Sequence, residues 1–222
     1  MQRQRGFTLI ELLVAITVLA IVAVLGWRGL DSILRSRATL TEQMEHTRGI
    51  LWPYAGSGQE ARLDGSIESA AFAQPSGLAL DEGVLYVADA ESNIIRAIDL
   101  PPKNEVRTLA GGDLFEFGDE DGKGDKARLQ HPLGVAVHDG RIVIADTYNH
   151  KIKLLHPAKR KVWTLAGTGT PGHRDGSGRK AQFYEPGGVS VIGDTIYVAD
   201  TNNHVVRAVD AKTGETRTVQ VR

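Results

Sequence analysis

Three aspartates stand at equivalent places in the C-terminal part of the chain and could together bind a metal ion or act in catalysis. Asp89, Asp146 and Asp200 each end a short apolar run, at intervals of 57 and 54 residues. Carboxylates are oxygen ligands for divalent cations and common general acids or bases. The alternative is that each carboxylate accepts hydrogen bonds from backbone N–H groups of the turn that follows, as in Asx-turns. Because the residue recurs in every repeat, the sequence favours this structural role. The same role is expected of the polar residues in those turns, Asn149, His150, Asn203 and His204.

A second set could form a binding site on one rim of the fold. Gln74, His131 and Glu185 each precede a proline at the same place in the repeat. A zinc site needs three good ligands that converge, and Gln74 is a poor one. None of the seven histidines recurs at one position in all three repeats, so we expect neither a metal nor another cofactor. The rim is therefore a candidate for binding a protein ligand.

A third set, Arg96, Lys153 and Arg207, also aligns across the repeats and could form a basic stripe. Residues 60–222 contain 20 basic and 23 acidic side chains, which argues against a phosphate-binding surface for nucleic acid. The sequence favours a solvated strand face for these three residues, with binding at the rim as the alternative.

The segment 119–125, DEDGKGD, resembles a calcium loop at first sight. In the EF-hand pattern, oxygen ligands fall at positions 1, 3 and 5, with glycine at position 6. Counting from Asp119, position 5 is Lys123 and position 6 is Gly124. A cation at a ligand position argues against calcium, and turn chemistry is sufficient to explain the segment.

A single glutamate interrupts the most apolar stretch of the chain. Residues 7–27, FTLIELLVAITVLAIVAVLGW, have about the length that crosses a bilayer as a helix. A carboxylate in hydrocarbon is costly unless a partner neutralises it, so Glu11 indicates an interaction inside the membrane. No small-residue cleavage pattern follows, which argues against a removed secretory signal. A plain single-span anchor is the alternative.

The elements that must position the C-terminal residues are short strands arranged in a repeat. Its inner strands begin in the segments FAQPSGLAL at 72–80, LQHPLGVAV at 129–137 and FYEPGGVSV at 183–191. Each is followed by a strand that ends in aspartate and by two further strands. Four short strands per unit predict an antiparallel meander, and repeated meanders predict propeller blades.

The propeller is expected to be incomplete. The segment LWPYAG at 51–56 aligns with VWTLAG at 162–167, so it corresponds to the outer strand of an earlier blade without its inner strands. Propellers have 4–8 blades, and three blades leave open edges that invite pairing with another chain. Two copies could build a six-bladed ring, although the surplus strand makes a cut from a longer propeller the simpler explanation.

Composition sets the remaining limits. The 222 residues include no cysteine, which excludes disulfides and thiol chemistry, and the net charge is −1. The sequence therefore predicts an α plus all-β chain: a long N-terminal hydrophobic helix followed by about three four-stranded antiparallel blades. The expected parts are a leader at 1–6, a transmembrane helix at 7–49 and a partial propeller at 50–222.

The first residues resemble a known family. Residues 5–13, RGFTLIELL, are similar to the signal of type IV prepilins and type II secretion pseudopilins, and residues 26–37 are similar to a minor pseudopilin of the J type. The resemblance implies that a prepilin peptidase cuts after Gly6 and methylates Phe7. It also implies that Glu11 pairs with the terminal amine of a neighbouring subunit during assembly, and that the rest of the chain lies in the periplasm, anchored in the bacterial inner membrane.

The blades resemble the NHL repeat. The pattern P-x-G-[VL]-[AS]-[VL] followed by VADTNNH at 198–204 carries the likeness, and the propeller of thioredoxin-like NHL proteins is similar in detail. Together the resemblances imply a non-catalytic, membrane-anchored pseudopilin-like protein whose blades bind protein. The second alternative is a soluble NHL scaffold fragment joined to a pilin start, by gene fusion or as an artefact. A metal-dependent NHL enzyme is the third.

Overall fold

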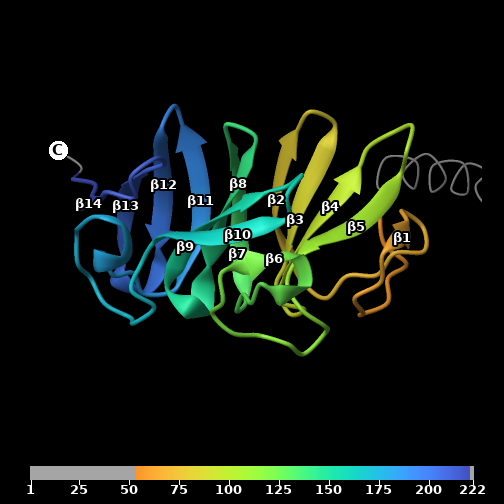
Figure 1. Ribbon diagram of the computed structural model, residues 1–222, viewed down its shortest axis with the longest axis horizontal. Helices are drawn as coiled ribbons and strands as arrows, with labels where there is room; N and C mark the ends of the chain where they lie inside the picture. Colours follow the sequence, from red (N-terminus) through yellow and green to blue (C-terminus); the bar gives the residue numbers. More distant parts are fainter. Residues whose placement is uncertain (1–53, 221–222) are drawn as a thin grey trace, which may run out of the picture. The chain divides into compact units, whose positions relative to one another are not determined.

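The computed structural model describes residues 54–220, which form β-strands, tight turns and short 3-10 turns (Figure 1). The expected α plus all-β class is wrong for this structure, because the described residues contain no α-helix. Apolar residues here come in short runs bounded by glycine, asparagine and aspartate, which favours strands over helices. The helix predicted for 7–49 falls outside the described residues. Within 54–220, no helix is long and apolar enough to cross a bilayer.

The strands form three successive antiparallel sheets, which confirms the predicted number of blades. Blade A comprises β2 (Pro75–Asp81), β3 (Val84–Asp89), β4 (Ile94–Asp99) and β5 (Glu105–Ala110). Blade B comprises β7 (Pro132–His138), β8 (Arg141–Asp146), β9 (Lys151–His156) and β10 (Lys161–Ala166). Blade C comprises β11 (Pro186–Ile192), β12 (Thr195–Asp200), β13 (Val205–Asp210) and β14 (Thr216–Thr218).

Short loops that contain Asp-Gly add a further strand to the outer edge of the first two blades. β1 (Gly65–Ser66) pairs with β5, and β6 (Gly122–Lys123) pairs with β10. In blade C an isolated bridge between Gly176 and Thr216 takes the same place. Four 3-10 turns complete the described elements: η1 (Gly124–Lys126), η2 (Thr147–Asn149), η3 (Gly178–Lys180) and η4 (Thr201–Asn203).

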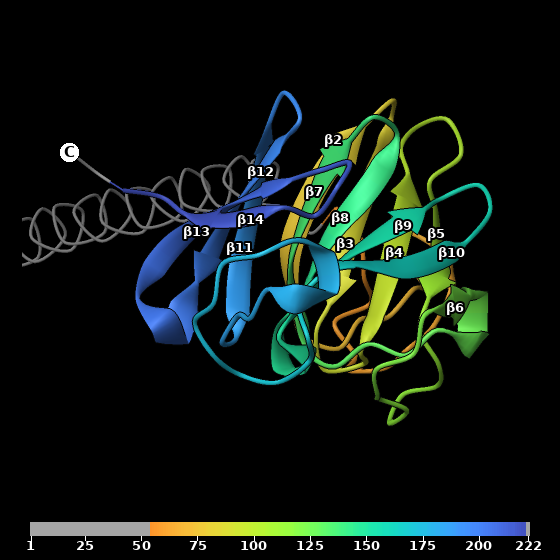
Figure 2. The same ribbon diagram turned by 60° about the vertical axis from the view of Figure 1, so that its left-hand side comes forward.

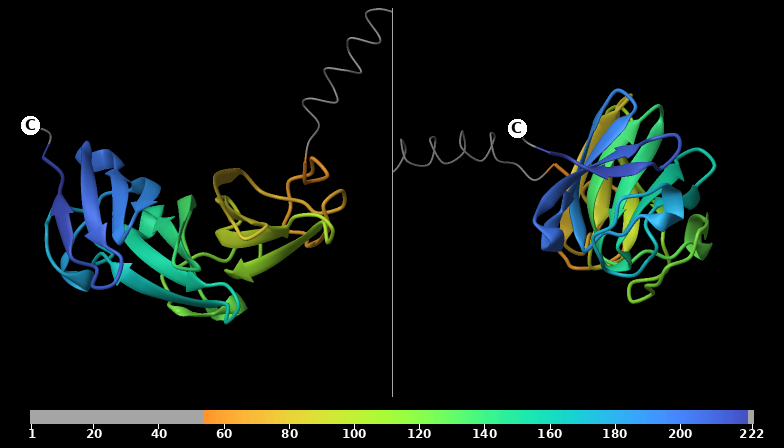
Figure 3. Two further views of the ribbon diagram at one scale, coloured as in Figure 1. Left: turned by 90° about the horizontal axis from the view of Figure 1, so that it is seen from above. Right: turned by 90° about the vertical axis from the view of Figure 1, so that its left-hand side faces the viewer.

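The three blades stack through their faces, with the inner strands β2, β7 and β11 adjacent in that order (Figure 2). Viewed from above, the blades follow one another around an open arc (Figure 3). One apolar cluster fills the space between blades A and B, and a second fills the space between B and C. Close approach of the inner strands requires glycine: a Cβ at Gly134 would lie 2.5 Å from the carbonyl oxygen of Gly187.

Candidate functional site

The strand-end aspartate of blade A lies in a buried ionic cluster. Arg96 has no exposed side-chain surface, and its Nη1 donates to Asp89 Oδ2 at 3.2 Å. Its Nη2 lies 2.8 Å from Asp64 Oδ1, in the Asp-Gly loop. The guanidinium carbon also sits 4.8 Å from the ring centre of Phe72. Through these contacts, Arg96 of β4 holds in place the Asp-Gly loop and the segment that leads into the inner strand β2.

Blade C repeats this cluster. Arg207 Nη1 donates to Asp200 Oδ2 at 2.8 Å, and Nη2 donates to Asp175 Oδ1 at 2.7 Å. Asp175 Oδ1 also accepts from Thr218 Oγ1, as Asp64 accepts from Thr108 in blade A. The cluster is therefore a property of the repeat.

Blade B uses a shorter cation and recruits a different carboxylate. Lys153 Nζ lies 3.0 Å from Asp146 Oδ2 and 2.9 Å from Asp119 Oδ1. Asp121, the Asp-Gly aspartate of this blade, bonds Thr164 Oγ1 at 2.9 Å but makes no ion pair with Lys153. Burial opposes the charge of Lys153, but the carboxylates of Asp146 and Asp119 outweigh it and raise the lysine pKa above its usual value.

The expectation of a solvated face for Arg96, Lys153 and Arg207 is wrong, because all three are fully buried. Each lies on the third strand of its blade, where the preceding loop covers it. A carboxylate seven residues earlier neutralises each cation. Each of these residues joins the strands and the loop of its own blade and is not available to a ligand at the surface.

The strand-end aspartates accept backbone N–H groups, as expected of a structural role, but from a different segment. Their Oδ1 atoms accept from the N–H groups of Ala73, Gln130 and Tyr184, each at 2.7 Å. These donors precede the inner strand, whereas the sequence indicated the following turn. The turn contributes side chains instead: Asn149 and Asn203 each donate to the aspartate of their own blade.

Carboxylates of the 119–125 loop are engaged by protein cations. Asp119 pairs with Lys151 and Lys153, and Asp121 pairs with Arg179 at 2.5 Å. Across residues 54–220, no cluster of three or more histidine and acidic side chains has the arrangement of a metal site.

The rim residues stand one per blade, each directly before the inner strand. Gln74, His131 and Glu185 share a left-handed backbone with φ of 59°, 50° and 52°. His131 stacks on Tyr148 with ring centres 4.7 Å apart, and Glu185 Oε2 accepts from Asn202 at 2.7 Å. No hydrogen bond or ion pair joins the three rim residues to one another in the described part of the chain.

Backbone N–H groups of the rim residues tie neighbouring blades together. The His131 N–H donates to Asn93 Oδ1 of blade A at 2.8 Å, and the Glu185 N–H donates to His150 Nδ1 of blade B at 3.1 Å. His150 must be neutral at Nδ1 to accept this bond. Burial favours that form and lowers the pKa of His150 below its usual value, against the opposing charges of Glu185 and Asp200.

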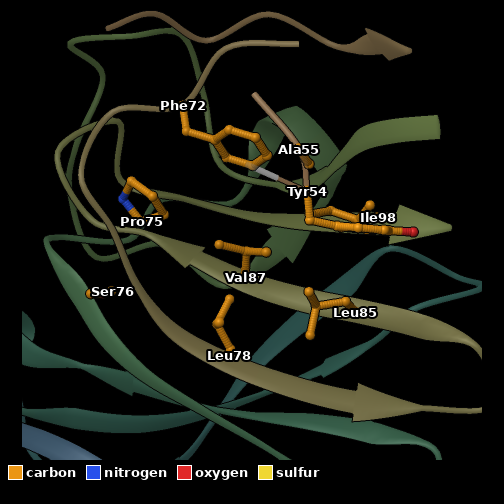
Figure 4. Close-up of a pocket in the computed structure, with 9 residues that line it drawn as sticks. All are labelled: Tyr54, Ala55, Phe72, Pro75, Ser76, Leu78, Leu85, Val87 and Ile98. Atoms are coloured by element: carbon orange, nitrogen blue, oxygen red, sulfur yellow. The ribbon is translucent and has the colours of Figure 1, made fainter. Parts of the chain in front are cut away.

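One feature that the sequence did not locate is an open apolar face on blade A. Phe72, Leu78, Leu85, Val87 and Ile98 project from its loop and strands into a cavity of about 250 Å³ (Figure 4). Its remaining lining residues are Tyr54, Ala55, Pro75 and Ser76. Leu78 is 61% exposed. Sequence reasoning anticipated unpaired strand edges. Among residues 54–220, the structure instead leaves this face of blade A without a neighbouring blade, although residues 55–72 cover part of it.

Blade C presents a second open face, on the side that points away from blade B. Ala199, Val205, Val206 and Val219 line a depression there together with Thr201 and His204. Val206 is 48% exposed. Both terminal blades thus offer apolar surface of the kind that is buried between blades inside the chain.

Comparison with known proteins agrees with these features. Residues 1–27 match the prokaryotic N-terminal methylation motif, and residues 129–153 and 183–208 match the NHL repeat. The chain is 47% identical over 178 residues to Protein SUPPRESSOR OF QUENCHING 1, chloroplastic, of Arabidopsis thaliana, covering 75% of this chain and 17% of that protein. It is 41% identical over 215 residues to NHL repeat-containing protein 2 of Bos taurus, covering 90% of this chain and 29% of that protein.

A solved structure supports the same fold. A Bacteroides thetaiotaomicron protein, provisionally described as a phosphatase, superposes with a TM-score of 0.56 at 18% identity, over 70% of this chain and 37% of its own. The chain spans less than a third of the length of both curated relatives. It is an NHL-repeat, β-propeller-like protein with a prepilin-type methylation motif at its N-terminus.

Proposed function

We propose that this protein is anchored in the bacterial inner membrane by its prepilin-type segment and presents its NHL blades in the periplasm for protein binding. One observation carries the proposal: a methylation motif at 1–27 precedes blades whose terminal faces are open and apolar. Exposed apolar patches of this kind mark protein contacts. The likeness of residues 26–37 to a J-type minor pseudopilin favours a place in type II secretion or type IV pilus assembly.

The N-terminal residues have distinct roles in this proposal. A prepilin peptidase cuts after Gly6 and methylates the amine of Phe7. Glu11 then pairs with the terminal amine of another pilin or pseudopilin subunit, which removes most of the cost of a carboxylate in the membrane.

The blades act as a binding module without catalysis. Their buried aspartates are committed to backbone N–H groups and to the cations of their own blades. The surfaces left for a partner are the apolar faces of blades A and C and the rim that carries Gln74, His131 and Glu185.

Fractionation of cells that produce the chain tests the anchoring. We expect the full chain in the membrane fraction and a variant without residues 7–27 in the soluble fraction. Glu11→Ala is the matched control: it should stay in the membrane and lose incorporation into filaments. Membrane retention without residues 7–27 would overturn the anchor, and unchanged incorporation of Glu11→Ala would remove the role of Glu11.

A second candidate function is a soluble NHL scaffold fragment joined to a pilin start. The observation that favours it is the placement of residues 54–56. The Gly56 N–H donates to Ile67 O, as Gly111 donates to Gly124 O and Gly167 donates to Gly178 O after the outer strands of blades A and B. Residues 54–56 thus occupy the place of the strand end of a preceding blade.

The tryptic peptide 49–62, GILWPYAGSGQEAR, distinguishes the two candidates, because it spans the junction. Its detection in membranes supports the anchored protein. Flanking peptides from both sides without it would assign the two parts to separate proteins.

A further inference from the structure

Each blade has a front face, turned toward the next blade in the chain, and a back face, turned toward the preceding one. The front of blade A packs on the back of B, and the front of B packs on the back of C. Only the back of A and the front of C have no neighbouring blade within the described residues. The two internal contacts therefore show what either open face is built to meet.

The open faces carry the same kinds of side chain as the internal ones. Ala88 and Ile95 are buried on the front of A, and the matching residues on the front of C are Ala199 and Val206, both exposed. On the back faces, Val135 is buried in the cluster between A and B, whereas its match Leu78 is open. The front of C is thus apolar at the positions that meet a back face, and the back of A is apolar at the positions that meet a front face.

A glycine on the front of C points to the same neighbour. Gly77 and Gly134 are required because the next inner strand passes close: a Cβ there would lie 2.6 Å from Leu133 O or 2.5 Å from Gly187 O. Gly188 holds the same repeat position in blade C. A Cβ on Gly188 would meet only the Ala199 Cβ, at 3.7 Å, so the blade itself does not require glycine here.

The hydrogen bond that joins each rim N–H to the preceding blade has only one of its two groups at each end of the three-blade unit. Asn93 and His150 accept the rim N–H of the following blade. His204 has the same position and the same left-handed backbone, with φ of 57°, and its exposed side chain makes no hydrogen bond with residues 54–220. The matching donor, the N–H of Gln74, likewise makes none. One end of the unit holds the acceptor and the other end holds the donor.

From these features we propose that a second copy of this chain docks head to tail, the front of blade C on the back of blade A of the partner copy. Both copies carry both faces, so the reciprocal contact closes a ring of six blades, within the range of propellers. The three blades of one copy follow an open arc (Figure 3). This inference rests on the proposed protein-binding role and names the partner.

Docking requires one local exchange. Val219 and Gln220 hold the repeat positions of Tyr54 and Ala55, so both pairs cannot occupy the back of blade A. Tyr54 is 46% exposed, and the hydrogen bond from Gly56 to Ile67 at 2.7 Å fixes the end of this segment. The exchange removes residues 54–56 of one copy and seats the outer strand of the other, so that the apolar side chain of Val219 takes the place of Tyr54.

Cross-linking of the full chain in membranes tests the contact, and the absence of cysteine makes engineered thiols specific. One tagged copy carries Gln74→Cys and a differently tagged copy carries His204→Cys. The internal link of 2.8 Å between Asn93 Oδ1 and His131 N places the two Cβ atoms within about 8 Å, which a short bismaleimide spans. We expect a covalent dimer with both tags. A yield no higher than with Ser177→Cys in place of Gln74→Cys would overturn the proposal.

Two further variants test the geometry and the closure. Gly188→Leu fills the space reserved for the partner and should lower the cross-link yield at least tenfold, whereas Ser177→Leu, on an exposed loop of the same blade, should not. An unchanged yield with Gly188→Leu would overturn this contact. The double variant Gln74→Cys/His204→Cys should stop at dimers, and a ladder of larger species would overturn closure. Because fractionation measures anchoring separately, loss of the dimer with the chain still in membranes refutes only the second-copy partner.

Discussion

Replacement of Lys153 by methionine tests whether the buried ionic clusters stabilise the blades. Lys153 Nζ contacts Asp146 at 3.0 Å, Asp119 at 2.9 Å and the carbonyl oxygen of Arg128 at 3.1 Å. Lys153 and Asp146 have no exposed side-chain surface. Methionine keeps most of the length and volume of the lysine, so the change is mainly electrostatic.

The size of the effect follows from what Asp146 retains. Its oxygens still accept from the Gln130 N–H at 2.7 Å and from Asn149 Nδ2 at 2.8 Å, but the counter-charge is gone. Removal of one member of a buried ion pair costs about 3–5 kcal/mol. The two remaining hydrogen bonds place the expected loss at the lower end, about 3 kcal/mol. Asp119 is partly exposed and regains water, so it adds little.

Equilibrium urea unfolding of the full chain measures this loss. Lys103→Met is the matched control, because Lys103 is 70% exposed and its Nζ lies 3.9 Å from Asp99. We expect the control to change the free energy of unfolding by less than about 0.5 kcal/mol. Addition of Asp146→Asn to Lys153→Met should recover part of the loss, since it removes the uncompensated charge. A loss for Lys153→Met no larger than that of the control would refute the reasoning.

Three further predictions concern pH and packing. The raised pKa of Lys153 means that its stabilisation is complete below about pH 10.5 and is lost as pH rises through the folded-state pKa. Lys153→Arg should remove this alkaline loss of unfolding free energy. An unchanged dependence of the unfolding free energy on pH would contradict this prediction. The lowered pKa of His150 means that its contribution is present above about pH 6.5 and is lost as pH falls below that value. His150→Asn, which copies Asn93, should flatten the acid side of the same titration; a slope that persists would assign it to another group. At protein concentrations where the chain is monomeric, Gly134→Ala should lower the urea midpoint by the equivalent of about 1–3 kcal/mol through overpacking, whereas Gly188→Ala should be nearly neutral. Equal effects would exclude the close strand approach as the cause.

The blades could be predicted because the residues that begin and end each strand are recognisable in the local sequence. Each inner strand begins at a proline that is followed two residues later by a glycine, and each second strand ends at an aspartate. This pattern predicts the number and order of the strands. The extra outer strand at Gly65–Ser66 was not predicted, since two residues carry no periodicity. The recurring Asp-Gly pairs were its only signal.

The buried cations could not be recognised from strand alternation alone. Arg96 lies in the run IIRAI, where a charged residue between apolar ones reads as solvent-facing. Its burial depends on Asp64, which is 32 residues away and comes from a loop. One signal was available: an aspartate precedes each of the three cations by seven residues, and that spacing is constant across blades of different sequence.

The open faces depend on how many blades stack, which no single repeat records. Leu78 and Val135 look alike in sequence, yet Leu78 is 61% exposed and Val135 is 5% exposed. The difference arises only because blade A has no blade behind it among the described residues. Tertiary stacking, rather than residue type, therefore defines the candidate binding surface.

Mass spectrometry of the chain extracted from membranes tests the central claim most directly, because it detects the processed N-terminus and the junction with the blades in one molecule. The account predicts a mature chain that starts at N-methylated Phe7 and contains the junction peptide 49–62. A chain that starts elsewhere without the methyl group would contradict processing. Peptides of the blades that never occur on the same molecule as the N-terminal segment would contradict the joined, anchored protein.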